Sequence, residues 1–141
     1  PYSILTPHKK EFERLFGKVE NDFEQVKLAQ QKATNLNVLI ILKGHYSFIA
    51  TPTGVGYFNS TGNAGMATGG SGDVLTGILA GLLAQSYTPV ETAILGVYLH
   101  GLAGNLAAKK YAEEAMIAGD IVDCLGDAFK SIHAGMRNAK R

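Results

Sequence analysis

Residues 38–42, Val-Leu-Ile-Ile-Leu, form an unbroken apolar run that is rich in β-branched side chains. Successive residues of a strand point to opposite faces of a sheet, so both faces of this segment would be apolar. Such a strand is typical of the interior of a parallel sheet that helices cover on both sides. The run therefore predicts an α/β architecture with a mostly parallel sheet between layers of helices.

Local patterns on either side of this strand predict the other elements. Thr6 and Pro7 indicate a helix start, with Thr6 as the N-cap and Pro7 at the first helical position. Thr88, Pro89 and Glu91 combine a cap, an N1 proline and a capping-box glutamate. Periodicity and turn residues predict strands at 3–5, 46–51 and 55–59 and helices at 7–16, 21–34, 73–85, 89–111 and 120–133. We expect the helix over 73–85 to be buried all round and its Gly77 and Gly81 to pack against another backbone.

Composition narrows the class of protein. The 141 residues suit one domain, and 13 basic residues nearly balance 12 acidic ones. The basic residues are scattered, so we expect no nucleic-acid partner. The longest purely apolar stretch, 78–84, is too short to cross a membrane, so we expect no membrane partner. The single cysteine, Cys124, favours a reducing compartment, and we expect a cytoplasmic protein.

A glycine-rich turn leads directly into an apolar helix at residues 62–77, GNAGMATGGSGDVLTG. It is not a P-loop, because it holds no lysine to reach a phosphate. It is not a dinucleotide fingerprint, because Leu75 replaces the last glycine of Gly-x-Gly-x-x-Gly and no strand immediately precedes it.

A phosphate site with a base inside it is the interpretation that remains. Amides at a helix start lack partners and lie at the positive end of the helix dipole. Gly70, Ser71 and Gly72 leave an anion room to approach them, and Asp73 in the first turn would stay ionised and accept a proton from a hydroxyl. The phosphate and the Asp73 carboxylate would be neighbouring anions that repel each other, so we expect a divalent metal ion, Mg²⁺. The sequence does not identify the ligands of this ion. The alternative is that Asp73 only caps a buried helix.

Residues 62–85, GNAGMATGGSGDVLTGILAGLLAQ, closely resemble the signature of the ADP/ATP-dependent NAD(P)H-hydrate dehydratases. Residues 5–17, LTPHKKEFERLFG, and 42–54, LKGHYSFIATPTG, are similar to the same family in the same order. The resemblance implies a ribokinase-like, three-layer αβα fold and a repair reaction on hydrated NADH or NADPH. In that reaction ADP or ATP phosphorylates the 6-hydroxyl of the hydrate, and phosphate is then eliminated.

The resemblance also implies roles for single residues. Asp73 would contact the hydrate and act as the base, and His8 would contact the hydrated dinucleotide. The anion hole would consist of Gly70, Ser71 and Gly72; the nucleotide would be bound by Lys43, Gly44, His45, Tyr46, Ser47 and Gly72; and Asn63 and Thr68 are weaker candidates near the phosphate. His100, in the middle of a helix, is expected to be a packing residue.

The dehydratase domain of this family is roughly twice as long as this chain. We therefore expect residues 1–141 to be the C-terminal half of the domain. The N-terminal half would lie outside this chain, and we expect it to be a candidate partner of this chain. The family tends to form homo-oligomers, and we expect one here. Two alternatives stay open: a ribokinase-like kinase for a vitamin precursor, and a nucleotide-binding assembly module without catalysis.

Overall fold

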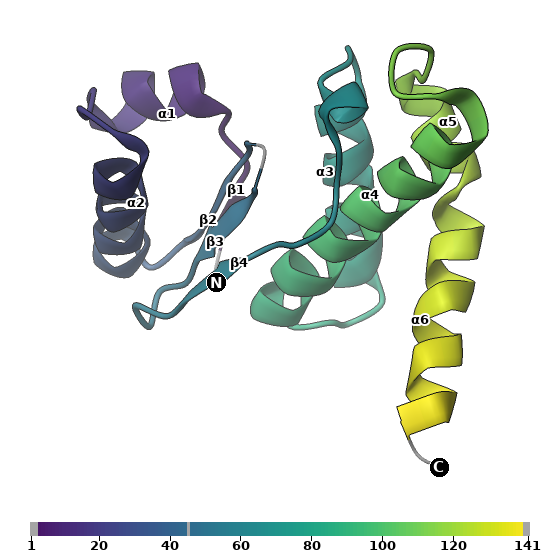
Figure 1. Ribbon diagram of the computed structural model, residues 1–141. Coiled ribbons are helices and arrows are strands. Elements are labelled where there is room, and N and C mark those ends of the chain that lie inside the picture. The colour runs from purple at the N-terminus through teal and green to yellow at the C-terminus, as the bar shows by residue number, and fades with distance from the viewer. Residues whose placement is uncertain (1–2, 45, 140–141) are drawn as a thin grey trace.

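The computed structural model describes residues 3–44 and 46–139. Figure 1 shows the strands between α1 and α2 on one side and α3 and α4 on the other, with α6 outside α4. This is the layered arrangement that the sequence predicts. The elements in chain order are β1 (Ile4–Leu5), α1 (Lys9–Phe16), α2 (Asp22–Leu36), β2 (Leu39–Leu42), β3 (Phe48–Ala50), β4 (Gly56–Phe58), a 3₁₀ turn (Ala64–Met66), α3 (Ser71–Ala84), α4 (Pro89–Tyr111), α5 (Ala118–Asp123) and α6 (Leu125–Ala139).

The strands form one sheet in the order β1-β2-β3-β4. β1 and β2 are parallel, with Ile4 opposite Leu39, whereas β2–β3 and β3–β4 are antiparallel. The α/β class is confirmed. The described part of the sheet is mixed rather than mostly parallel, because the predicted hairpin supplies two antiparallel pairings beside one parallel pairing.

Strand β2 is buried on both faces, as its apolar run predicts. Ile40 and Leu42 belong to the apolar cluster that contains Phe12 of α1 and alanines of α2. Leu39 and Ile41 belong to the opposite cluster, which residues of α3 and α4 complete. The two-residue period of the strand thus divides the core into one layer on each side of the sheet.

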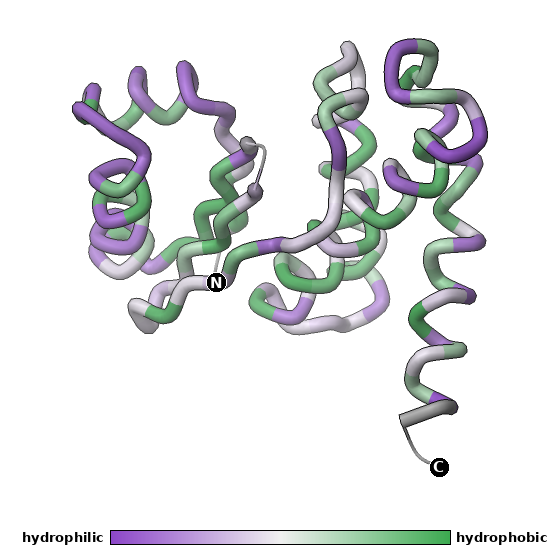
Figure 2. The backbone as a smooth tube through the Cα atoms, viewed as in Figure 1, coloured by the Kyte–Doolittle hydropathy of each residue, from purple (hydrophilic) through white to green (hydrophobic). Residues whose placement is uncertain are grey.

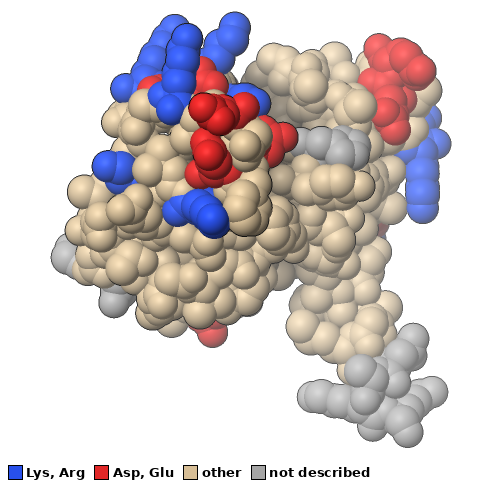
Figure 3. All heavy atoms as spheres, turned by 60° about the vertical axis from the view of Figure 1, so that its left-hand side comes forward, with Lys and Arg blue, Asp and Glu red and all other residues tan. Residues whose placement is uncertain are grey.

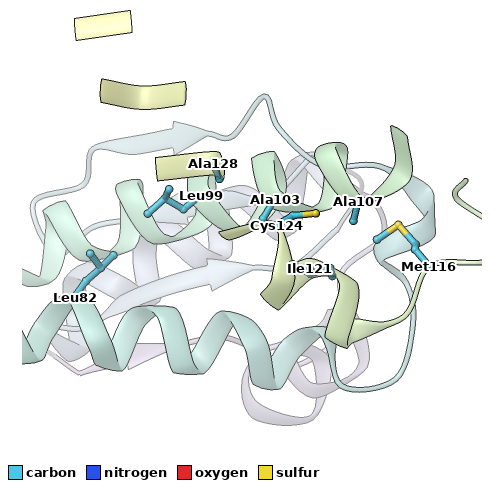
Figure 4. Packing of buried hydrophobic residues seen from close by; sticks show 8 residues of the cluster. All are labelled: Leu82, Leu99, Ala103, Ala107, Met116, Ile121, Cys124 and Ala128. Carbon is cyan, nitrogen blue, oxygen red and sulfur yellow. The ribbon is translucent and has the colours of Figure 1, made fainter. Parts of the chain in front are cut away.

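A third apolar cluster joins α3, α4, α5 and α6. Figure 4 shows its buried residues, Leu82, Leu99, Ala103, Ala107, Met116, Ile121, Cys124 and Ala128. The single helix predicted at 120–133 is wrong, because the chain forms α5 and α6 instead. The break falls at Cys124, whose ψ of −4° departs from helical geometry while its side chain packs into the cluster. Burial raises the pKa of the Cys124 thiol.

The start of α1 also differs from the prediction. His8, not Thr6, is the N-cap: its Nδ1 accepts from the Glu11 amide at 3.3 Å, and the Glu11 carboxylate accepts from the His8 amide at 2.8 Å. Thr6 and Pro7 instead prolong the extended chain of β1, because the Lys43 amide donates to the Pro7 carbonyl oxygen at 3.2 Å. Strand pairing has therefore displaced the helix start beyond the proline.

Helix α3 is buried on one face only, which corrects the expectation of burial all round. Leu75 and Leu79 lie in the core, whereas Asp73 is exposed. A Cβ added at Gly77 or Gly81 would meet nothing within 4 Å. The predicted close backbone contact at these two glycines is therefore absent from the described part of the chain.

Helix α4 begins as predicted, with Thr88 as a capping-box residue and Pro89 at the first helical position. The loop over residues 59–68 lies directly on this helix. A Cβ at Gly101 would be only 2.6 Å from the Thr61 carbonyl carbon, and Gly104 is similarly close to the side chain of Met66. Glycine is needed at Gly101 because the loop backbone occupies the space of a side chain.

Hydrophobic residues line the strands and run through α3 and α4, whereas α1 is largely hydrophilic (Figure 2). Figure 3 shows one face of the molecule, on which basic and acidic side chains are interspersed at the α1–α2 end. None of the helices in residues 3–44 and 46–139 combines the length and the apolar character needed to cross a membrane.

Candidate functional site

The predicted site residues gather where the carboxyl ends of β1 and β2 meet the start of α3. Lys43 directly follows β2 and forms a parallel bridge with His8. Parallel pairing thus brings both residues to the same edge of the sheet, where open α/β sheets place their ligands. A Cβ at Gly72 would lie 3.3 Å from the Lys43 Nζ, so the ammonium group reaches the first turn of α3.

The first turn of α3 has amides available for a ligand. Gly70 has a φ of +87°, a conformation that glycine adopts without strain, and it offers no side chain to cap the helix. Side chains cap α1, α2 and α4. The Ser71 amide donates to the Thr68 carbonyl oxygen at 3.3 Å. Within residues 3–44 and 46–139, no group accepts from the amides of Gly72 and Asp73.

Lys43 adds a full positive charge to this helix end. No acidic side chain in the described part of the chain forms an ion pair with it. A cation beside unpaired helix-terminal amides is the arrangement that binds phosphate in many proteins. The local electrostatics therefore favour an anion at the Gly72 amide.

Two cavities adjoin this point. The first, here called the loop pocket, has a volume of about 560 Å³ and lies between Lys43, the loop 59–68 and helix α4. The second, here called the Asp73 pocket, has a volume of about 530 Å³ and includes Asp73, Glu11 and Arg14. Lys43 and Gly72 line both cavities. A phosphate held there would be reachable from either side.

The structure brings most of the predicted site residues together. Asp73 lines only the Asp73 pocket, Gly70 forms the turn behind it and lines neither cavity, and Tyr46 is 67% exposed and lines neither. His45 lies outside the described residues. The loop pocket is lined by His8, Lys43, Gly44, Ser47, Asn63, Thr68, Ser71 and Gly72.

Sequence reasoning missed several residues that line the two cavities. Glu11 and Arg14 follow His8 at spacings of three and six, so a helical projection would have grouped them. The backbone hydrogen bond from His8 lowers the pKa of the Glu11 carboxyl group. Thr61 and His100 line the loop pocket, and each forms a hydrogen bond with a residue far away in the sequence, Tyr98 and Ser71 respectively, so no local signal marks these contacts.

Asn63 presents an unsatisfied acceptor in the loop pocket. Its amide nitrogen donates to the Asn105 Oδ1 at 3.1 Å. Its own Oδ1 is buried and has no hydrogen-bond partner among the described residues. Buried acceptors are rarely left without a donor, so this oxygen is an unusual feature of the wall of the loop pocket.

Comparison with known proteins points to one family. The sequence profile of the NAD(P)H-hydrate dehydratases matches residues 2–126. A bifunctional NAD(P)H-hydrate repair enzyme from Moorella thermoacetica is 48% identical over 126 residues, which is 86% of this chain and 23% of that protein. An ADP-dependent (S)-NAD(P)H-hydrate dehydratase from Bacillus subtilis is 36% identical over 90% of this chain and 47% of its own length.

A solved structure agrees with the sequence relatives. The ADP/ATP-dependent NAD(P)H-hydrate dehydratase from Bacillus subtilis, co-crystallised with ATP/Mg²⁺, superimposes with a TM-score of 0.85 at 35% identity, over 92% of this chain and 48% of that one. The chain thus spans between 23% and 48% of the length of these relatives. With its profile match over most of its length, the chain belongs to the NAD(P)H-hydrate dehydratase family.

Proposed function

We propose that the protein containing this chain is an ADP- or ATP-dependent NAD(P)H-hydrate dehydratase. The observation that carries the proposal is the position of Lys43 and Gly72, which line two cavities at once, with Asp73 in one of them. A phosphoryl donor in the loop pocket and a hydroxyl acceptor in the Asp73 pocket would meet at the start of α3. The arrangement suits transfer of a phosphoryl group between two substrates.

The nucleotide would occupy the loop pocket. Lys43 and the amides of Gly72 and Asp73 would bind its terminal phosphate, with Gly70 and Ser71 shaping the turn that presents them. Gly44 and Ser47 would contact the rest of the nucleotide. We assign His45 and Tyr46 to the same neighbourhood. Thr68 and Asn63, which line the loop pocket, would lie near the phosphates.

Asp73 would act as the general base. Its carboxylate takes the proton from the 6-hydroxyl group of the hydrate, and that oxygen forms a bond to the terminal phosphorus. The bond from this phosphorus to the bridging oxygen breaks, which releases AMP from ADP or ADP from ATP. The ring carbon then loses the phosphate with its electron pair, and the adjacent ring carbon loses a proton to water. The double bond of NADH or NADPH is restored, because phosphate is a far better leaving group than hydroxide.

His8 would serve the hydrated dinucleotide, at the boundary between the cavities. It lines the loop pocket, and its imidazole Nε2 lies 3.3 Å from a carboxylate oxygen of Glu11, which lines the Asp73 pocket. The capping hydrogen bonds to Glu11 fix the position of His8, so the residue is oriented before the substrate arrives.

We expect Mg²⁺ to accompany the nucleotide, as in the Bacillus subtilis structure. Mg²⁺ is usually held by phosphate oxygens with one or two carboxylates rather than by a complete set of protein ligands. The described residues fit this pattern: they contain no group of three acidic, histidine or cysteine ligands, so the ion would be held mainly by the phosphate oxygens of the nucleotide. Bound there, the ion would neutralise charge on the transferring phosphate.

We further propose that residues 1–141 form the C-terminal half of the dehydratase domain. The exposed face of α3, with Gly77 and Gly81 unopposed, suits coverage by the N-terminal half. Among the described residues β1 is an edge strand of the sheet, where a further strand could be added. The buried thiol of Cys124 is compatible with a cytoplasmic protein, and we expect a homo-oligomer, as in the family.

The proposal is tested with the intact protein, NADH hydrate, Mg²⁺ and either ADP or ATP. We expect the near-ultraviolet absorbance of NADH to return, and phosphate to be released, only when nucleotide is present. Asp73→Asn removes the base and should slow the reaction about 10²–10⁴-fold. Nucleotide affinity, measured by calorimetry, should change little, because Asp73 does not line the loop pocket.

Two outcomes would contradict the proposal. A stable phosphorylated product without recovery of NADH would indicate a kinase. Nucleotide binding without any turnover by the intact protein would indicate a binding module.

A further inference from the structure

Helix α4 places an imidazole against the first turn of α3. The Nε2 of His100 lies 3.3 Å from the Oγ of Ser71, the first residue of α3, and Ser71 is only 6% exposed. His100 also lines the loop pocket, together with Lys43 and Gly72. The proposed function gives His100 no role, and the sequence suggests only packing.

The surroundings of His100 favour the neutral imidazole. Burial lowers its pKa most, and the charge of Lys43 lowers it further, while a hydrogen bond to the Ser71 backbone raises it. Lys43 and His8 are the other titratable side chains among the described residues around the loop pocket. A neutral imidazole has one N–H and one lone pair, so the Nε2 of His100 either donates to the Ser71 hydroxyl or accepts from it, according to the tautomer.

The first turn of α3 needs such a contact. It follows Gly69 and Gly70, which restrict the backbone little, and no side chain caps it. Leucine could fill the same space in α4 without the cost of burying a polar group. The hydrogen bond to Ser71 is therefore the feature that a packing role leaves unexplained.

We propose that His100 is a positioning residue for the phosphate-binding turn: by holding Ser71, it fixes the amides of Gly72 and Asp73 beside Lys43. This inference rests on the proposed binding of a nucleotide in the loop pocket. A turn that is fixed before binding loses less entropy when phosphate arrives, so the hydrogen bond contributes to nucleotide affinity without contacting the nucleotide.

The test is a set of substitutions in the intact protein, with ADP and ATP affinity measured by calorimetry in the presence of Mg²⁺. His100→Leu keeps an apolar volume and removes the hydrogen bond, and we expect affinity to fall about 3–10-fold, the value of one hydrogen bond. His100→Gln places an amide near the position of Nε2 and should bind within about twofold of the original protein. Ser71→Ala should weaken binding as much as His100→Leu, and the double variant no more than either.

His133→Gln, on the exposed part of α6, is the matched control and should leave affinity unchanged. Three results would each overturn the inference. His100→Leu could bind nucleotide with the original affinity, His100→Gln could lose as much affinity as His100→Leu, or the losses of affinity could add in the double variant. Absence of nucleotide binding by the unsubstituted protein would instead overturn the proposed function, so the two failures are distinguishable.

Discussion

Gly101→Ala tests how closely the loop 59–68 is held against α4. The new Cβ would lie 2.6 Å from the carbonyl carbon of Thr61 and 2.7 Å from its carbonyl oxygen, whereas ordinary contacts begin at 3.4 Å. The difference between 3.4 and 2.6 Å means that the Thr61 backbone must move by about 0.8 Å. A backbone cannot rotate away as a side chain can, so the whole loop has to shift.

Three effects determine the size of the change in stability. Overpacking costs about 2 kcal/mol at such a site. The shift also strains the hydrogen bond from the Thr61 hydroxyl to the Tyr98 carbonyl oxygen, 2.9 Å long, which is worth about 1 kcal/mol. Alanine in place of glycine within α4 returns about 1 kcal/mol. We therefore expect a net loss of about 2 kcal/mol in the free energy of unfolding.

The same shift should weaken nucleotide binding, because Thr61, Asn63 and Met66 line the loop pocket. A wall displaced by this amount should cost about tenfold or more in affinity. Urea unfolding and calorimetric titration of the intact protein measure the two effects. Gly126→Ala in α6, where a Cβ meets nothing within 4 Å, is the control and should raise stability by up to about 1 kcal/mol, the gain in helix propensity alone. If Gly101→Ala were as stable as the original protein and bound nucleotide equally well, the loop would not rest on Gly101 and the reasoning would be refuted.

Three further predictions concern other parts of the fold. Thr88→Ala removes the N-cap of α4 and should lower the free energy of unfolding by about 1 kcal/mol in urea, and an unchanged midpoint would contradict the role of the cap. Burial lowers the pKa of His100 below 6.5 in the folded protein, so the unfolded chain binds a proton at this residue first as the pH falls. We therefore expect the free energy of unfolding to decrease below about pH 6.5. Urea unfolding at several pH values should show that His100→Leu lacks this part of the decrease. Gly77→Ala should destabilise the intact protein by about 1–3 kcal/mol if the proposed N-terminal half covers α3, whereas a gain of about 1 kcal/mol would show that the face is open.

Several features could be predicted from the sequence because short-range patterns determine them. The apolar run at 38–42 identifies a strand buried on both faces, and Thr88 with Pro89 identifies the start of α4. The glycine-rich turn before Asp73 marks a helix start with unpaired amides. Each of these rests on strand alternation, capping or backbone freedom, which act over a few residues.

Other features depend on contacts between distant parts of the chain. His8 replaces Thr6 as the N-cap of α1 because the Lys43 amide donates to the carbonyl oxygen of Pro7. The predicted C-terminal helix breaks at Cys124, whose side chain packs into the core. The contact of His100 with Ser71 joins residues 29 positions apart. The sequence by itself determined the strand at 38–42, the start of α4 and the glycine-rich turn before Asp73, because their signals are local. Only the tertiary structure decided which side chains line the two cavities, because packing α4 against α3 and the loop 59–68 brings distant residues together.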